Sequence, residues 1–332
     1  MSGPEEIAVA VSRLRSGGMV AFPTETVYGL GAPALDAAAV DRVFALKGRP
    51  SNNPLIVHVS GIEMARRVVA SWPRDAETLA RAFWPGPLTL VLPKAPSVPP
   101  VVTAGAPNVA VRCPDHPLTL ALLEVFGEPL VGPSANLSGR ISPTAATHVT
   151  ESFESEQVFV LDGGPCRRGI ESTVVTLAGP VPRVLRPGVI GAEAIAGVLG
   201  REVRGFDGAE QPGALPDAPL ESPGRLESHY APLAPAVLLD RAGLESLLRS
   251  ARAPVAVLSH ESLDVRPPHT LERMPTDASD YAAALYAALR RADARSPHTI
   301  AVLRPALAVG ADASVWEAVL DRLRRATSGR AL

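Results

Sequence analysis

Four cationic side chains stand at, or just beyond, the ends of predicted helices and strands. Lys47 ends a predicted helix and Arg49 follows it, while Arg112 and Arg186 each end a short β-branched segment shortly before a proline. Lysine presents a point charge, and arginine presents a planar fork that pairs with phosphate or carboxylate oxygens. Together they would bind a polyanion, whereas singly they are compatible with helix-dipole contacts or solvated surface charges. The sequence does not show whether the four converge, so both interpretations stay open.

Short polar side chains fill the loops between the predicted strands. Thr24 and Thr26 lie in PTETVYGLG, and further hydroxyl and amide groups lie in SANLSG (134–139), at Ser142 and in EST (171–173). Such side chains commonly bond to nearby backbone groups in turns. They are equally suited to act as neutral donors to a nucleotide or to an amino acid. His58 stands in the middle of a predicted strand, where a lone histidine is typical of a hydrogen-bonded structural residue.

Several common kinds of catalytic site are excluded by their motifs. The chain has no G-x-x-x-x-G-K-[ST] phosphate loop, no G-x-S-x-G nucleophile elbow and no H-E-x-x-H metal motif. Cys166 has Arg167 and Arg168 beside it, which can lower a thiol pKa, although a structural cysteine is the simpler interpretation. The inventory therefore favours a reaction driven by positioning and charge stabilisation over covalent catalysis.

Composition narrows the class of protein. The 332 residues carry 32 Lys plus Arg against 34 Asp plus Glu, a net charge of −2, which argues against a chain-wide basic surface for duplex DNA. Hydrophobic residues make up 46% and aromatic residues 4%, so we expect aliphatic cores and few base-stacking platforms. Two cysteines, no signal-peptide pattern and no apolar run of membrane-spanning length predict a cytoplasmic protein.

The C-terminal third alternates strands and helices. A Pro- and Gly-rich stretch over 207–235 predicts a linker that separates a domain over 1–206 from one over 236–332. Beyond it, strands are predicted at 236–240, 254–259 and 299–303, with helices over 244–248, 280–291 and 315–323. This alternation predicts parallel pairing in a small Rossmann-like α/β domain, without a G-x-G-x-x-G dinucleotide turn.

The first 206 residues predict a twisted, mixed open sheet with helices. Helices are expected over 5–15 and 36–47, the second with Asp36 as N-cap and Gly48 just past its end. MVAF, LIVHV, LTLVL, VAVR, VFVL and STVVTL are predicted strands. PTETVYGLGAP, GRPSNNP, GPSANLSGRISP and DGGPCRRGIES are predicted loops that carry the polar groups.

In order along the chain, these segments match one known family. The set is PTETVYGLG, KGRP-x-x-NPL-x-x-H, WPGPLTLVL, VAVRCPDHP, PSANLSGRISPT, DGGPC-x-x-GIESTVV and LRPG. It resembles the YrdC-like L-threonylcarbamoyladenylate synthases. The linker motif SPG-x-x-x-x-HYAP (222–232), followed by a small α/β domain, is similar to the long two-domain form.

The resemblance implies a reaction and a set of site residues. Members condense L-threonine, bicarbonate and Mg²⁺-ATP into threonylcarbamoyl-AMP and pyrophosphate, and a separate transferase then modifies tRNA. Lys47 and Arg49 would be catalytic. The residues implied for threonine are Thr26, His58, Arg112 and Ser172. Those implied for ATP are Arg49, Asn53, Asn108, Ser134, Asn136, Ser142, Arg186 and Tyr230. Mg²⁺ would be held by phosphate oxygens and water, with no ligand from a protein carboxylate.

Two rival functions remain at this point. The positive concave surface of the family would suit an RNA-binding module, and it would also allow weak binding of tRNA by the enzyme. Related carbamoyl transferases carry this domain within much larger chains that have zinc-finger-like cysteines, which this chain lacks. Lid support, dimer contact and partner docking are equally compatible roles for the C-terminal domain.

Overall fold

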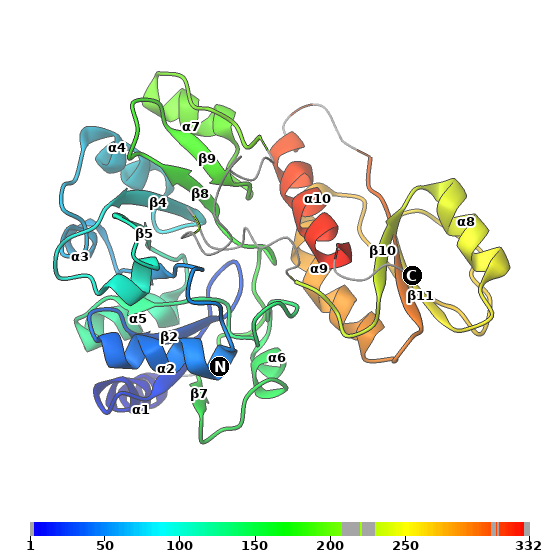
Figure 1. Ribbon diagram of the computed structural model, residues 1–332, viewed down its shortest axis with the longest axis horizontal. Helices are drawn as coiled ribbons and strands as arrows, with labels where there is room; N and C mark the ends of the chain where they lie inside the picture. Colours follow the sequence, from blue (N-terminus) through cyan, green and yellow to red (C-terminus); the bar gives the residue numbers. More distant parts are fainter. Residues whose placement is uncertain (1–2, 208–219, 221–229, 307–309, 311, 329–332) are drawn as a thin grey trace.

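The computed structural model describes residues 3–207, 220, 230–306, 310 and 312–328. Within these residues the strands form two sheets, one of nine strands and one of four. Figure 1 shows the larger sheet with its helices on the left and the smaller sheet on the right. The predicted combination of a twisted mixed sheet with a smaller Rossmann-like unit is confirmed.

The larger sheet is built from both parallel and antiparallel pairs, in the order β7-β1-β2-β6-β3-β5-β4-β8-β9. Its strands are β1 (Met19–Phe22), β2 (Gly29–Pro33), β3 (Ile56–His58), β4 (Leu88–Pro93), β5 (Asn108–Arg112), β6 (Leu130–Val131), β7 (Val158–Val160), β8 (Thr173–Thr176) and β9 (Arg183–Arg186). β3 and β4 each lie beside β5, the first parallel to it and the second antiparallel. As a result, the C-terminal ends of β3 and β5, which carry His58 and Arg112, lie side by side in the sheet.

One loop prediction is wrong. The segment PTETVYGLGAP contains β2, which pairs antiparallel with β1 on one side and with β6 on the other. Its glycines and prolines predict a turn, but pairing on both sides supplies the backbone hydrogen bonds that a strand needs.

The helices of this part are α1 (Pro4–Arg15), α2 (Ala37–Lys47), α3 (Ile62–Arg66), α4 (Arg74–Phe83), α5 (Pro117–Phe126), α6 (Ala146–Thr150) and α7 (Ala192–Leu199). α2 confirms its predicted caps: the Asp36 carboxylate accepts from the backbone N–H groups of Ala38 and Ala39, and Gly48 is left-handed with φ 58°. Because the left-handed Gly48 ends α2, Lys47 is the last residue of this helix.

The smaller sheet has the order β10-β13-β11-β12, and all of its pairs are parallel. Its elements are β10 (Ala236–Leu239), α8 (Arg241–Ser250), β11 (Val255–Ser259), β12 (Thr270–Arg273), α9 (Ala278–Asp293), β13 (Thr299–Leu303) and α10 (Ala313–Thr327). The parallel arrangement is confirmed, while β12 was not predicted from the sequence. α8 packs on one face of the sheet with Val255 and Val257, and α9 and α10 pack on the other with Leu258 and Val302.

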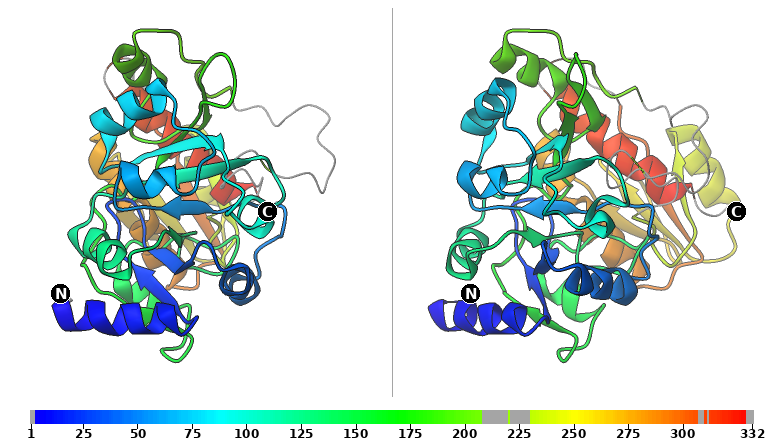
Figure 2. Two further views of the ribbon diagram at one scale, coloured as in Figure 1. Left: turned by 90° about the vertical axis from the view of Figure 1, so that its left-hand side faces the viewer. Right: turned by 60° about the vertical axis from the view of Figure 1, so that its left-hand side comes forward.

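The two parts of the molecule share a hydrophobic core. One apolar cluster joins Val27, Ile141 and Ile170, from loops of the larger part, to buried residues of α9 and α10. Figures 1 and 2 place α9 and α10 between the two sheets and α8 on the far side of the smaller one. Most of the predicted linker, including residues 222–229 of its motif, lies outside the described residues, whereas Tyr230 is described.

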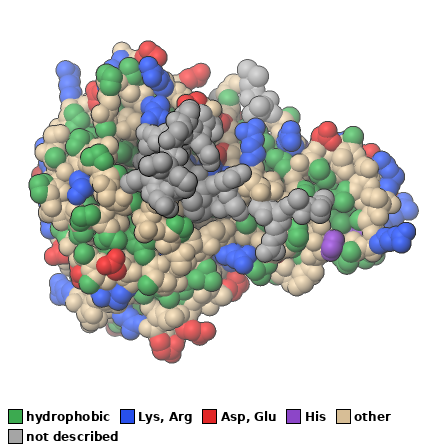
Figure 3. Space-filling view, in the orientation of Figure 1, with side chains coloured by type: hydrophobic (Ala, Val, Ile, Leu, Met, Phe, Trp, Pro, Cys, Tyr) green, Lys and Arg blue, Asp and Glu red, His purple; other side chains and the backbone are tan. Residues whose placement is uncertain are grey.

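The surface carries both signs of charge. In Figure 3, outside the area that grey atoms cover, Lys and Arg side chains are interspersed with Asp and Glu over both parts of the molecule. No helix within the described ranges is long and apolar enough to cross a membrane.

Candidate functional site

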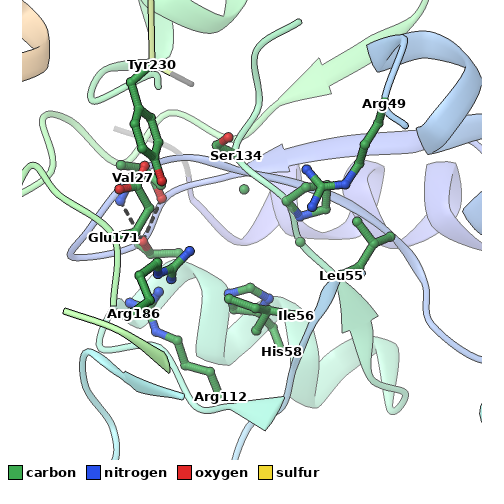
Figure 4. A pocket seen from close by; sticks show the side chains of 14 residues that line it. Val27, Arg49, Leu55, Ile56, His58, Arg112, Ser134, Glu171, Arg186 and Tyr230 are labelled. Atoms are coloured by element: carbon green, nitrogen blue, oxygen red, sulfur yellow. Dashed lines mark hydrogen bonds between the residues drawn. The ribbon is translucent and has the colours of Figure 1, made fainter. Parts of the chain in front are cut away.

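A cavity opens where the loops after several strands of the larger sheet come together. Its empty space, including open solvent at the mouth, is about 540 Å³. Figure 4 shows its side chains arriving from β3, β5, β9, the turn after α2 and the linker. The residues that line it are Thr24, Val27, Gly29, Arg49, Leu55, Ile56, His58, Arg112, Gly132, Pro133, Ser134, Glu171, Arg186 and Tyr230.

Three of the four predicted cations line this cavity. Arg49, Arg112 and Arg186 are all part of its wall. Lys47 is 2% exposed and lies behind Ser134, where its Nζ donates to the carbonyl oxygens of Ser134, at 2.6 Å, and Asn136. Burial, helped by the charge of Arg49, lowers the pKa of Lys47 well below its usual value. The cations therefore converge in the structure, although they come from three separate segments of the chain: the end of α2 with the turn after it, the end of β5 and the end of β9.

Arg49 is fixed by the turn that follows it. Its Nε donates to the Asn53 carbonyl at 2.9 Å, and its Nη2 donates to Asn53 Oδ1 and to the Pro54 carbonyl, both at 2.7 Å. Burial lowers the pKa of Arg49 to about 9, and the positive charge of Arg186 acts in the same direction. Asn53, predicted to contact ATP, thus orients Arg49 in this structure.

Arg112 forms a buried ion pair that the sequence did not reveal. Its Nη2 donates to Glu25 Oε1 at 2.7 Å, and the two side chains are 4% and 2% exposed. The other Glu25 oxygen accepts from the Asp115 backbone N–H at 3.0 Å, and Arg112 Nε donates to the Gly86 carbonyl at 3.2 Å. Glu25 lies inside the PTETVYGLG motif, and this position marks it as a candidate site residue. Its pairing with Arg112 is visible only in the folded structure.

His58 is neutral in this environment. Burial and the charge of Arg112 lower its pKa well below the usual value. Its Nδ1 is buried and has no hydrogen-bond partner among the residues that the structure describes. A Cβ on Gly132 would lie 2.6 Å from that atom, so only glycine lets the backbone pass so close to the ring. A buried, unpartnered ring nitrogen facing a cavity is suited to meet a ligand atom.

Thr24 and Thr26 form the turn that enters the cavity. The Thr24 hydroxyl accepts from the backbone N–H groups of Thr26 and Val27, each at 3.1 Å, and donates to the Val27 carbonyl at 2.6 Å. The Thr26 hydroxyl lies 2.8 Å from that of Thr24. Thr24 therefore satisfies turn backbone groups, which is one of the two roles that the sequence left open.

Glu171, at one wall of the cavity, accepts several hydrogen bonds. Its Oε1 accepts from the Ser142 hydroxyl at 2.8 Å. Burial alone would raise its pKa, but the charges of Arg322 and Arg186 and the donated hydrogen bonds outweigh it and lower the pKa to about 2. Arg186 donates to Ser172, from Nε to the carbonyl and from Nη2 to the hydroxyl, both at 3.1 Å. Ser142, Ser172 and Arg186 thus form one connected unit.

The remaining predicted residues divide into two groups. Ser134 and Tyr230 line the cavity, whereas Asn136 is buried and its own backbone carbonyl accepts from Lys47 Nζ. Asn108 begins β5, four residues before Arg112 and so about 13 Å along the strand, and it is not among the lining residues. The contact of Asn108 with ATP stays a prediction.

The two cysteines behave as structural residues. Burial raises the pKa of both Cys113 and Cys166 to about 12, so the arginines after Cys166 do not make it a thiolate. Within the described part of the chain, no group of three or more His, Cys, Asp or Glu side chains is placed to hold a metal ion.

The fold and the cavity define a class: an α/β protein with a small cavity lined by three arginines. Two family models match the chain, one described as "Telomere recombination" over residues 12–188 and one described as the C-terminal domain of threonylcarbamoyl-AMP synthase over residues 190–328.

Two relatives match this chain in sequence along nearly its whole length and nearly the whole of their own. The threonylcarbamoyl-AMP synthase of Pyrococcus abyssi is 40% identical over 98% of this chain and 95% of its own, and that of Bacillus subtilis is 39% identical over 98% and 94%. A crystal structure of P. abyssi Sua5 in complex with L-threonine matches with a TM-score of 0.86 and 38% identity, covering 97% of this chain and 94% of that one. The chain belongs to the threonylcarbamoyl-AMP synthase family, in its long two-domain form, and is an adenylate-forming transferase.

Proposed function

We propose that this chain condenses L-threonine, bicarbonate and ATP into threonylcarbamoyl-AMP and pyrophosphate in the cavity described above. The observation that carries the proposal is the convergence of Arg49, Arg112 and Arg186 on one small polar cavity, beside a neutral histidine. Three reactants that are anions or carry a carboxylate need such a set of cations to be held together.

The threonine end of the site is the Arg112 side. The guanidinium of Arg112 is held by Glu25 and by the Gly86 carbonyl, which leaves its remaining donors for the carboxylate of threonine. His58, Thr26 and Ser172 would complete this end with neutral hydrogen-bonding groups. Because His58 is uncharged, its free Nδ1 can accept or donate a hydrogen bond without adding charge.

The ATP end is the side of Arg49 and Arg186. These two cations would contact phosphate oxygens, with Asn53, Ser134, Asn136, Ser142 and Tyr230 around the nucleotide and Asn108 as a more distant contact. Mg²⁺ would arrive with the triphosphate. The carboxylates of Glu25 and Glu171 are already occupied by donors, so the metal would be held by phosphate oxygens and water.

The chemistry requires two anions to meet. The threonine amine adds to CO₂ derived from bicarbonate, and an oxygen of the resulting carbamate attacks the α-phosphorus of ATP, from which pyrophosphate leaves. Arg49, Arg186 and Lys47 would offset the repulsion and stabilise the charge on pyrophosphate. A bound polyphosphate would also raise the pKa of Lys47, which would keep its ammonium charged when it is needed. Orientation contributes on the order of 7–11 kcal/mol in the best-oriented intramolecular reactions.

The product implies a downstream partner. Threonylcarbamoyl-AMP is an activated, water-labile mixed anhydride, so it would pass to a separate transferase that modifies tRNA. A purely RNA-binding role is less favoured, because the face drawn in Figure 3 carries both signs of charge outside the grey atoms and the net charge is −2. Tight tRNA binding with a steep salt dependence, without ATP turnover, would favour this rival.

The direct test measures pyrophosphate release by the purified full chain with Mg²⁺-ATP. We expect release that needs both L-threonine and bicarbonate, with threonylcarbamoyl-AMP identified by mass spectrometry. Omitting either substrate is the matched control. No pyrophosphate with all three present, or release that ignores threonine and bicarbonate, would overturn the proposal.

A further inference from the structure

Arg322 is an arginine of the C-terminal part that reaches the wall of the cavity. It lies on α10 and is 0% exposed. Its Nε donates to Glu171 Oε2 at 2.9 Å, its Nη1 to Asp321 Oδ2 at 2.6 Å, and its Nη2 to the Pro187 carbonyl at 2.9 Å. Glu171 and Pro187 belong to the larger part of the molecule, so this single side chain joins α10 to two loops beside the proposed active site.

Tyr286, on α9, reaches the same carboxylate. Its hydroxyl donates to Glu171 Oε2 at 2.9 Å. Glu171 therefore accepts from Arg322 and Tyr286 on one oxygen and from Ser142 on the other. Of these three side-chain donors, the two on Oε2 come from the C-terminal part.

The same two residues hold Tyr230. The Tyr286 ring stacks on the Tyr230 ring with centroids 5.4 Å apart and planes 26° apart, and the Arg322 guanidinium lies 5.6 Å from the Tyr230 centroid. Tyr230 is 1% exposed and has φ +64°, a conformation that a bulky residue keeps only when its surroundings fix it. Figure 4 shows Tyr230 beside Glu171 on one side of the cavity, opposite Arg49.

We infer that Arg322 and Tyr286 are positioning residues for the reaction, through which the C-terminal part holds Glu171 ionised and seats Tyr230 against the substrates. The expected effect on turnover rests on the proposed function, whereas the positioning of Glu171 and Tyr230 does not. The sequence left three roles open for the C-terminal part, and the inference favours lid support over dimer contact and partner docking.

The charge on Glu171 depends on groups from four elements. Arg322 of α10, Tyr286 of α9, Arg186 of β9 and the linker residue Tyr230 all interact with it, and Asp321 of α10 pairs with Arg322. Burial opposes the ionised carboxylate, and Arg322 is the foremost group that opposes this effect. Without Arg322 the pKa of Glu171 would rise, and Ser142 would lose a fixed acceptor when the carboxyl group takes up a proton.

The first test compares two single-atom deletions on one helix. Tyr286→Phe removes the hydroxyl bound to Glu171 but keeps the ring against Tyr230, whereas Tyr281→Phe removes a buried hydroxyl that has no partner within the described residues. We expect Tyr286→Phe to lower kcat/KM about 10-fold or more, with activity lost toward acidic pH, and Tyr281→Phe to stay within twofold of the unaltered protein. Equal pH profiles for the two variants would overturn the inference.

The second test separates positioning from folding. Arg322→Met should reduce turnover, and Arg322→Lys should restore part of it. The pair Arg322→Met with Glu171→Gln removes both charges of this buried ion pair, and Asp321 keeps its ion pair with Arg325, so the double variant should regain thermal stability relative to Arg322→Met without regaining turnover. Turnover restored together with stability would show that the ion pair is only structural.

A readout independent of activity keeps the two proposals apart. All four tyrosines are buried, and nitration by tetranitromethane followed by peptide mass spectrometry reports which of them becomes accessible. We expect Tyr230 to be nitrated several-fold faster in Arg322→Met than in the unaltered protein. An unchanged rate in a folded Arg322→Met variant would overturn the seating of Tyr230, whatever the turnover assay shows. Absence of turnover in the unaltered protein would instead overturn the proposed function.

Discussion

Replacing Glu25 by glutamine tests whether the buried Arg112 pair organises the threonine end of the site. The amide keeps the size of the side chain but removes its charge. Glu25 now accepts from Arg112 at 2.7 Å and from the Asp115 N–H at 3.0 Å, so the amide nitrogen of glutamine must face one of these two donors. Breaking a buried pair by removing one charge costs about 3–5 kcal/mol. At about 2–4 °C per kcal/mol for a domain of this size, the melting temperature should fall by roughly 6–20 °C.

The assay is thermal unfolding followed by circular dichroism near neutral pH, with and without L-threonine. Threonine should raise the melting temperature of Glu25→Gln more than that of the unaltered protein, because its carboxylate would replace the missing partner of Arg112. Glu63→Gln is the matched control: Glu63 is 93% exposed and lies 3.7 Å from Arg66, so its loss should cost at most about 0.5 kcal/mol. A Glu25→Gln protein that melts within 2 °C of the original, a limit of roughly 1 kcal/mol, would refute the reasoning.

Three further predictions concern the same cavity. Lys47→Met should lower kcat about 100-fold or more, as expected for loss of a key electrostatic stabiliser, and near-normal steady-state kinetics would contradict this role. Gly132→Ala places a Cβ 2.6 Å from His58 Nδ1 and should raise the KM for threonine, while Gly197→Ala, which meets nothing within 4 Å, should leave it unchanged. Because the folded pKa of His58 is lowered, the unfolded chain takes up a proton first, so the free energy of unfolding should decrease as pH falls below about 6.5. Denaturant titrations from pH 7 to 5 should show a flatter decrease for His58→Gln, and equal slopes would contradict the assignment of a neutral His58.

Local signals predicted much of the framework. Asp36 and Gly48 located α2, and β-branched runs located β1, β3, β4 and β5. β2 was missed because Gly29–Pro33 has the composition of a turn and becomes a strand only through pairing on both sides. Such pairing is a tertiary effect that a local pattern does not encode.

Charge partners were harder to predict than the charges themselves. The four cations were recognised from their places at the ends of elements, but Glu25 and Arg322 were not. Arg322 lies in the run DRLRR, which has the appearance of a solvated helix face, yet it is fully buried against Glu171. The partner of a buried charge comes from another element, so only the packing of α10 on the larger part reveals it.

The most direct test of the central claim is a crystal structure of the full chain with L-threonine and a non-hydrolysable ATP analogue. We predict the threonine carboxylate on Arg112 and the phosphates beside Arg49 and Arg186, with Tyr230 closing over both ligands. Ligands bound outside this cavity, for example in the cleft that Trp84, Arg168 and Asp312 line between the two parts of the molecule, would contradict the account.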